Sequence, residues 1–146
     1  MGSSIAWNLA KTAAKEDLLV IEPDPTYEFA ATPRAVGGIR FVQGLKENLE
    51  MSLYGFHVFK NFAHELGIDE DLVDLNFHEC GYLFLGTKDQ SKSFESNQKM
   101  LTGCGAEILL LDKEKLKALL PQFNFKDVEV GLYSPRDARI DPYSAL

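Results

Sequence analysis

The segment Leu18-Leu19-Val20-Ile21-Glu22 decides the fold that the sequence predicts. An apolar run without polar alternation is typical of a parallel strand covered on both faces. A helix of small residues is predicted before it, over residues 3–15, and Glu16-Asp17 link this helix to the strand. A helix, a short link and a buried strand ending in an acid form the second half of a dinucleotide-binding βαβ unit. In that unit Glu22 would accept hydrogen bonds from an adenosine ribose, and the pyrophosphate would lie at the helix N-terminus.

The first half of that unit is missing from the sequence. No strand precedes the helix, and only Gly2 could serve as the last glycine of a G-x-G-x-x-G loop. An acid at position 22 favours a free ribose hydroxyl over a 2′-phosphate, which indicates FAD or NAD rather than NADP. The residues alone leave a structural alternative open, in which Glu22 is an exposed acid at a strand end.

A long irregular segment, residues 24–46, contains Gly37-Gly38-Ile39-Arg40. Connections of this length inside compact domains are uncommon and usually functional. Paired glycines let the backbone approach a flat or anionic ligand, and Arg40 could stabilise negative charge there. A plain loop without a ligand is the alternative interpretation of these four residues.

The rest of the chain alternates helices and strands, which gives an α/β fold class that is α+β overall. Gly67 and Asp112 are placed as a helix C-cap and a helix N-cap, respectively. Helices are predicted over residues 47–66, 90–102 and 113–120, strands over residues 81–86, 107–111 and 128–133, and a further helix start at Asp141-Pro142.

Composition excludes several classes of function. The 146 residues have the length of one domain, and 45% hydrophobic content is enough for a core. A net charge of −7 argues against nucleic acid or an anionic membrane as the main partner. No apolar run approaches the roughly 20 residues of a transmembrane helix. The two cysteines and three histidines lack the spacing of a metal site, so we expect no metal and two reduced thiols.

Taken in order, these segments resemble the FAD-dependent oxidoreductases of the D-amino-acid oxidase, glycine oxidase and sarcosine oxidase superfamily. Within it, the chain is most similar to the branch of the mitochondrial FAD-dependent oxidoreductase domain proteins and their bacterial relatives. The motifs that carry the resemblance lie in residues 1–7, 20–27, 36–40, 45–54, 81–85, 95–97 and 140–142. They are spread over almost the whole chain and are specific for the superfamily rather than for a substrate.

The resemblance implies an incomplete Rossmann-like FAD-binding domain and the beginning of a mixed-sheet substrate domain. On that plan residues 1–74 are the FAD-binding portion, without its first strand. Residues 75–136 belong to the substrate domain, and residues 137–146 return toward the FAD-binding domain. We therefore expect a polypeptide that needs further chain to be active, and no turnover by these 146 residues alone.

The resemblance also implies which residues bind FAD. Gly2 and Ser3 would lie at the pyrophosphate, and Glu22 would lie at the adenosine ribose. Thr32 and Arg34 would flank phosphate or flavin. The residues along the isoalloxazine would be Gly37, Gly38, Ile39 and Arg40. Arg40, nearest the reactive edge, would be the catalytic residue. Some branches carry a histidine beside the glycine pair, in places linked covalently to the flavin. Here Ala35 and Val36 take that place, so a covalent link is not supported.

The implied reaction is oxidation of the C–N bond of an amino acid or of a secondary or tertiary amine. FAD accepts a hydride equivalent from the carbon beside the nitrogen, and the imine product hydrolyses. The implied partners are this small substrate and a companion chain or electron-acceptor protein. The implied location is the bacterial cytoplasm, or the mitochondrion in a eukaryote. Two alternatives remain: a non-catalytic assembly module derived from such an enzyme, and an NAD-dependent enzyme. The second is disfavoured because nicotinamide domains usually enter another helix after the acid.

Overall fold

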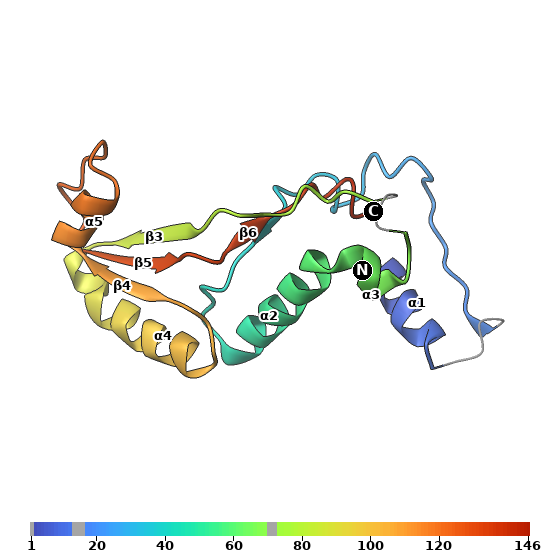
Figure 1. Cartoon of the computed structure of the whole chain (residues 1–146), viewed down its shortest axis with the longest axis horizontal. Helices are drawn as coiled ribbons and strands as arrows, with labels where there is room; N and C mark the ends of the chain where they lie inside the picture. The colour runs from blue at the N-terminus through green and yellow to red at the C-terminus, as the bar shows by residue number, and fades with distance from the viewer. Residues whose placement is uncertain (1, 13–16, 70–72) are drawn as a thin grey trace.

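The computed structural model describes residues 2–12, 17–69 and 73–146. It is a mixed α/β structure, as predicted, with two small antiparallel sheets; α2 and α4 lie below the strands in Figure 1, and α5 lies at the left-hand end of the larger sheet. The helices are α1 (Gly2–Ala10), α2 (Lys46–Lys60), α3 (Phe62–Leu66), α4 (Ser91–Gly103) and α5 (Lys113–Leu119), with a 3-10 turn at Lys88–Gln90. The strands are β1 (Gly38–Ile39), β2 (His78–Glu79), β3 (Tyr82–Gly86), β4 (Leu109–Asp112), β5 (Val130–Ser134) and β6 (Ala138–Arg139).

The larger sheet has the order β3-β5-β4, and its three strands confirm the three predicted from the sequence. Val130 and Leu132 on the central strand β5 are buried. A Cβ atom on Gly131 would lie 2.8 Å from the Leu116 side chain of α5. The glycine therefore lets α5 approach the middle of the sheet closely, and Leu116 is itself fully buried there.

The smaller sheet has the order β1-β6-β2 and joins parts of the chain that are far apart in sequence. Ala138 of β6 lies opposite Ile39 on one side and Glu79 on the other. These strands are not predicted from the sequence, which indicates an irregular segment over the whole of residues 24–46. Strands of two residues are too short for an alternating pattern, so only the pairing itself defines them.

The predicted helix over residues 47–66 is two helices, α2 and α3, which meet at Asn61. Asn61 leaves the helical conformation (φ −116°, ψ 33°), and its side-chain amide donates to the His57 carbonyl at 2.9 Å. Asparagine favours such local hydrogen bonds over a continuous helix, which explains the break. Gly67 has φ +66° and is the C-cap of α3, as predicted.

Two predicted caps also have defined outcomes. Asp112 caps α5, because its carboxylate accepts from the Lys115 amide at 2.9 Å. Asp141 accepts from the Tyr143 amide and the Ser144 hydroxyl, both at 2.9 Å, but the residues that follow form a turn. The helix predicted to start at Asp141-Pro142 is therefore wrong in this structure, although its capping hydrogen bonds form.

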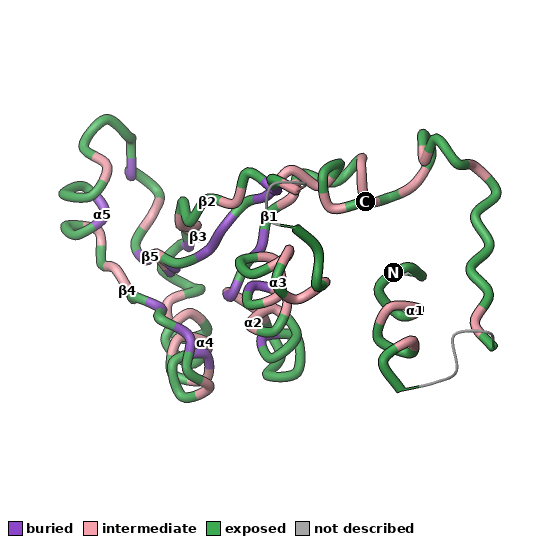
Figure 2. Tube along the Cα trace, turned by 45° about the vertical axis from the view of Figure 1, so that its right-hand side comes forward, coloured by how far each residue is buried: buried purple, intermediate pink, exposed green. Residues whose placement is uncertain are grey.

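The strand predicted at residues 18–22 is also wrong in this structure. The segment is irregular, with Leu19 83% and Ile21 80% exposed (Figure 2). A parallel strand needs a neighbour to satisfy its backbone groups, and no strand of the described ranges lies beside this one. The preceding helix, predicted over residues 3–15, ends at Ala10 in α1. Residues 13–16 lie outside the described part of the chain.

An aromatic cluster forms the part of the core between α2 and the smaller sheet. Phe56 of α2 lies edge-on to Phe41, with ring centroids 5.2 Å apart, and to Phe77 at 5.3 Å. The Arg136 guanidinium lies 5.3 Å from the Phe56 ring centroid. Because Phe41 directly follows the Gly37–Arg40 segment, this cluster supports that segment at its C-terminal end.

Candidate functional site

Gly37 begins the segment in which the sequence predicts flavin contacts, and its position demands glycine. Its φ is +76°, and a Cβ atom there would lie 2.1 Å from the Ile140 carbonyl oxygen. The Ile140 amide donates to the Gly37 carbonyl at 3.0 Å. The close approach lets β1 pair with β6, so the missing side chain already serves packing within the chain.

Gly38 and Arg40 both lie against Tyr82, the first residue of β3. A Cβ atom on Gly38 would lie 2.5 Å from the Tyr82 hydroxyl oxygen. The Arg40 guanidinium carbon lies 5.6 Å from the centroid of the Tyr82 ring. Ile39 between them is buried, whereas Arg40 is exposed. The segment thus offers one solvent-accessible positive charge, backed by an aromatic ring.

Asp137 is the buried acid of this region, and it is not among the residues predicted to bind FAD. Its side chain is fully buried. One carboxylate oxygen, Oδ1, accepts from the Phe41 amide at 2.9 Å and from the Ser134 hydroxyl. The other oxygen, Oδ2, has no hydrogen-bond partner among the described residues. Asp137 therefore contacts the residue next to Arg40 from the other end of the chain.

Burial raises the pKa of the Asp137 carboxyl above its ordinary value. The hydrogen bonds from Ser134 and Phe41 and the positive charge of Arg40 lower this pKa, but they do not cancel the loss of hydration. The folded protein therefore binds this proton more tightly than the unfolded chain does.

The pH dependence of stability follows from that shift. The stabilising contribution of protonated Asp137 is complete below the aspartate pKa of the unfolded chain and is lost as pH rises through the higher folded-state value. We expect Asp137→Asn to gain stability relative to the unmodified chain as pH rises from about 4 toward neutrality. Urea unfolding of both proteins across this pH range measures the difference between their free energies of unfolding. The contributions of the other acidic residues are the same in both proteins and cancel in this difference. A difference that stays flat or shrinks with rising pH would contradict the expectation.

The residues predicted at the adenosine end of FAD lie elsewhere. Gly2 and Ser3 are exposed in the first turn of α1, and nothing lies within 4 Å of the place of a Cβ atom on Gly2. No acidic side chain stands in that turn. Glu22 is exposed and accepts a hydrogen bond from the Asp24 amide at 3.0 Å. α1 lies apart from β1 in the views of both Figure 1 and Figure 2.

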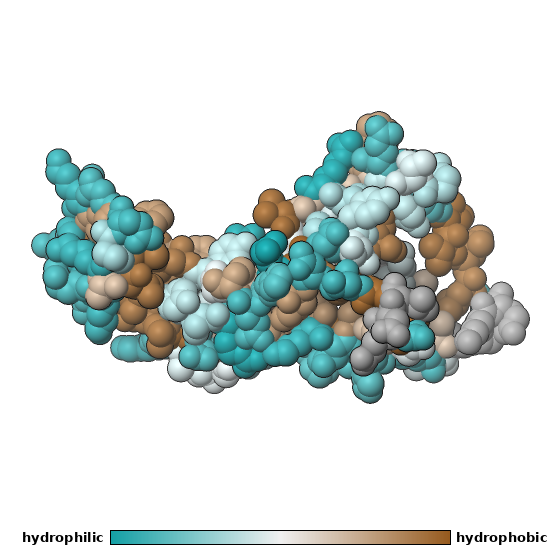
Figure 3. All heavy atoms as spheres, turned by 45° about the horizontal axis from the view of Figure 1, so that its top comes forward, coloured by the Kyte–Doolittle hydropathy of each residue, from teal (hydrophilic) through white to brown (hydrophobic). Residues whose placement is uncertain are grey.

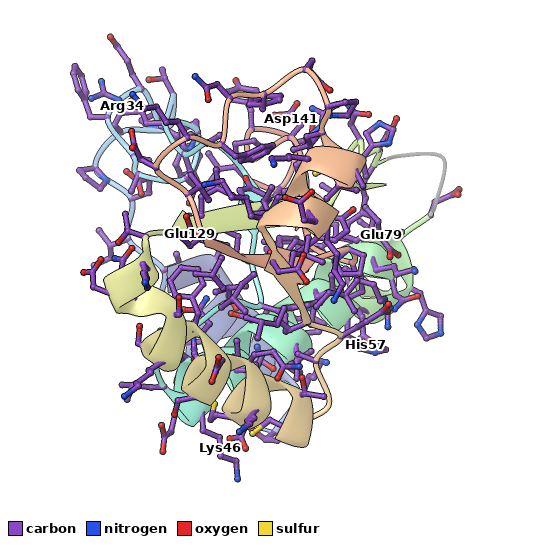
Figure 4. All side chains as sticks on the ribbon, turned by 90° about the vertical axis from the view of Figure 1, so that its left-hand side faces the viewer. Arg34, Lys46, His57, Glu79, Glu129 and Asp141 are labelled. Atoms are coloured by element: carbon purple, nitrogen blue, oxygen red, sulfur yellow. The ribbon has the colours of Figure 1, made fainter. Side chains whose placement is uncertain are left out.

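Thr32 and Arg34 lie on the irregular segment between Glu22 and Gly37. Thr32 is half-buried, and its carbonyl accepts from the Ala35 amide at 3.0 Å. Arg34 donates from Nε to the Glu28 carbonyl at 2.9 Å, and its guanidinium carbon lies 5.0 Å from the Phe29 ring centroid. In Figure 4 Arg34 lies at the outer edge of the molecule, away from helices α2 and α4.

The donor set fits FAD in its chemistry. A helix N-terminus free of acids suits a pyrophosphate, an exposed carboxylate suits a ribose, and an exposed guanidinium suits electron-rich flavin oxygens. Gly2 and Ser3 lie on α1, Glu22 lies in the irregular segment 18–22, and Gly37 to Arg40 lie at and beside β1.

Two hollows of the described surface lie away from these residues. One, of about 390 Å³, lies between α5 and residues 121–126, and another, of about 310 Å³, lies beside α3. Neither is lined by a predicted FAD-binding residue.

Hydrophobic surface is visible at the right-hand end of Figure 3. Across the described ranges, no three His, Cys, Asp or Glu side chains gather as a metal site, and no helix has the length and apolar character to cross a bilayer.

The chain belongs to the family of FAD-dependent oxidoreductases of the D-amino-acid oxidase type, whose family model matches residues 1–146. The family is FAD-dependent, which removes the NAD-dependent alternative. The comparisons with known proteins do not favour a non-catalytic module either.

Named relatives place the chain within this family. It is 34% identical to FAD-dependent oxidoreductase domain-containing protein 1 of Xenopus laevis over 151 residues, covering 100% of the chain and 30% of that protein. It is 31% identical to human mitochondrial dimethylglycine dehydrogenase, covering 99% of the chain and 16% of that protein. The structure of L-proline dehydrogenase from P. horikoshii superposes with a TM-score of 0.64 and 25% identity, covering 78% of this chain and 29% of that one. The chain thus spans about a third or less of each of these proteins.

Sequence reasoning missed Asp137, Ser134 and the role of Tyr82. The Ser134-x-x-Asp137 spacing at the end of a predicted strand was a signal of a side-chain hydrogen bond in a turn. The bond from Phe41 had no such signal, because it joins residues 96 positions apart. Tyr82 is predicted as a strand residue and lies in one of the motifs of the resemblance, but its contacts with Gly38 and Arg40 are not predicted.

Proposed function

We propose that this chain contributes the FAD-contacting part of an oxidoreductase that oxidises the C–N bond of an amino acid or of a secondary or tertiary amine. The family match over the whole chain supports the reaction class. Two of the named relatives, dimethylglycine dehydrogenase and L-proline dehydrogenase, are named for amino acids with a tertiary and a secondary amine. The observation that carries the proposal is the Gly37–Arg40 segment, which presents Arg40 at the surface against Tyr82.

When bound, FAD would supply the hydride acceptor for the carbon beside the amine nitrogen. The residues of this chain bind and orient. The first-turn amides of α1, including Gly2 and Ser3, would hold the pyrophosphate, and Glu22 would accept from the ribose hydroxyls. Thr32 and Arg34 would flank phosphate or flavin. Arg40 would stabilise negative charge on the flavin ring, next to the backbone of Gly37, Gly38 and Ile39.

The proposed domain plan has partial support in the pairing of strands. On it residues 1–74 contribute to the FAD-binding domain, residues 75–136 to the substrate domain, and residues 137–146 return to the first. The pairing of β6 with β1 supports this return, since it joins residues 138–139 to residues 38–39. A companion chain or electron-acceptor protein would complete the system. For a eukaryotic source, the name of the human relative supports a mitochondrial location.

The test is a titration of the purified chain with FAD, followed by flavin fluorescence and visible absorbance. We expect saturable binding that NAD does not displace. Arg40→Met should weaken this binding about tenfold, because it removes the exposed positive charge but keeps a long side chain. Glu95→Gln, which changes an exposed acid on α4, is the matched surface control and should leave the affinity unchanged. No saturable binding, or equal affinities of the Arg40 and Glu95 variants, would count against the proposal.

A further inference from the structure

One buried carboxyl group links the proposed flavin segment to the C-terminal part of the chain. We propose that Asp137 is a positioning residue for the Gly37–Phe41 backbone, held in place by its contacts to Phe41 and Ser134. This inference rests on the proposed function for its flavin role, although the placement of the backbone can be tested separately. Nothing in the sequence motifs of the FAD site includes Asp137.

The geometry supports such a role because Asp137 is bound from three sides. Its Oδ1 accepts from the Phe41 amide at 2.9 Å and from the Ser134 hydroxyl. Its main-chain carbonyl accepts from the Cys80 amide at 2.9 Å and the Gly81 amide at 2.8 Å. The residue therefore fixes the end of β1 relative to both β2 and the turn that precedes β6. Its own position has little freedom.

The position of Arg40 depends on that arrangement. Arg40 is the residue directly before Phe41, and its positive charge acts on the Asp137 carboxyl. A hydrogen bond to the next backbone amide therefore restricts where the Arg40 backbone can lie. The Phe41 side chain is buried against Phe56, which limits movement of the segment in the same direction. The segment is thus held from its backbone side while the Arg40 side chain stays accessible.

The use of an acid at a fully buried position is itself informative. A buried carboxyl group with one oxygen unpartnered costs stability compared with an apolar residue of similar size. Packing alone gives no reason for an acid there. A specific acceptor for a buried main-chain amide 96 residues away does give one.

The experiment compares Asp137→Ala, Asp137→Asn and a control of general destabilisation, Leu132→Ala, in the 146-residue chain. Leu132 is a buried residue of β5 and has no part in the site. Hydrogen exchange of the Phe41 amide, measured by NMR, is the first readout, and the dissociation constant for FAD is the second. We expect Asp137→Ala to speed Phe41 exchange about tenfold more than Leu132→Ala does, and to weaken FAD binding about tenfold. Asp137→Asn keeps an acceptor oxygen and should restore both values to within about threefold of the unmodified chain.

Each outcome decides one of the two proposals. Equal Phe41 exchange in the Asp137→Ala and Leu132→Ala variants would overturn the positioning role, as would a failure of Asp137→Asn to restore it. If Asp137→Ala does not fold, Asp137→Leu fills the volume without an acceptor and replaces it in the comparison. Absence of FAD binding by the unmodified chain would count against the proposed function, whereas the exchange data would still decide the positioning role.

Discussion

Replacing Gly37 by alanine is expected to destabilise the protein by about 3 kcal/mol or more. Two costs combine at this position. The backbone at φ +76° disfavours any residue with a Cβ atom, by roughly 1–2 kcal/mol. The new Cβ atom would also lie 2.1 Å from the Ile140 carbonyl oxygen, so β1 and β6 must separate. Denaturant unfolding, followed by far-UV circular dichroism, measures the loss.

Two other glycines separate these costs. Gly67 has φ +66° with nothing within 4 Å of a Cβ atom, so Gly67→Ala should show the backbone cost alone, roughly 1–2 kcal/mol. Gly44 has neither a positive φ nor a neighbour, and Gly44→Ala should be close to neutral. If the Gly37 and Gly67 variants lose equal stability, the close approach to Ile140 contributes nothing and the described pairing of β1 with β6 is wrong.

Replacing Phe56 by alanine is the second large effect, expected at about 3–5 kcal/mol. Phe56 is only 6% exposed and joins Phe41 and Phe77 into one cluster. Its removal leaves a cavity between α2 and the smaller sheet, and it takes away the edge-to-face contacts of both neighbouring rings. The midpoint of urea unfolding is the measurement.

Tyr54 provides the matched control, because it is an aromatic residue of the same helix that is 60% exposed. Tyr54→Ala should change stability by no more than about 0.5 kcal/mol. A loss at Tyr54 comparable to that at Phe56 would mean that α2 presents its other face to the core. That result would also remove the support that we assign to the Gly37–Arg40 segment.

The sequence predicted best where structure is determined locally. The three strands of the larger sheet have clear apolar runs. Asp112 indicates a helix start through its side-chain acceptor, and Gly67 indicates a helix end through its left-handed backbone conformation. The helix over residues 47–66 was predicted in extent but not in its break, because the effect of Asn61 depends on which local hydrogen bond its amide makes.

Prediction failed where structure depends on a distant partner. Residues 18–22 have the composition of a buried strand, but composition cannot supply the neighbouring strands that such a segment requires. The two-residue strands β1, β2 and β6 have no periodicity to detect and exist only through pairing. Of the candidate site, the Gly37–Arg40 segment was found from its residue types. Asp137 was not, because its function as an acceptor for Phe41 is a property of the folded chain.

The central place of β6 in the smaller sheet has a consequence for the order in which the protein folds. The Phe41 amide can form its hydrogen bond to Asp137 only after a residue 96 positions later has been synthesised. Strands β1 and β2 likewise can pair only once β6 has been synthesised. Loop closure over such a distance is slow compared with formation of α4 or of the β3-β5 pair. The Gly37–Arg40 segment should therefore be among the last parts to become ordered on the ribosome, long after it has left the exit tunnel. Any flavin that binds there would meet a chain in which residues 38–139 have already been synthesised.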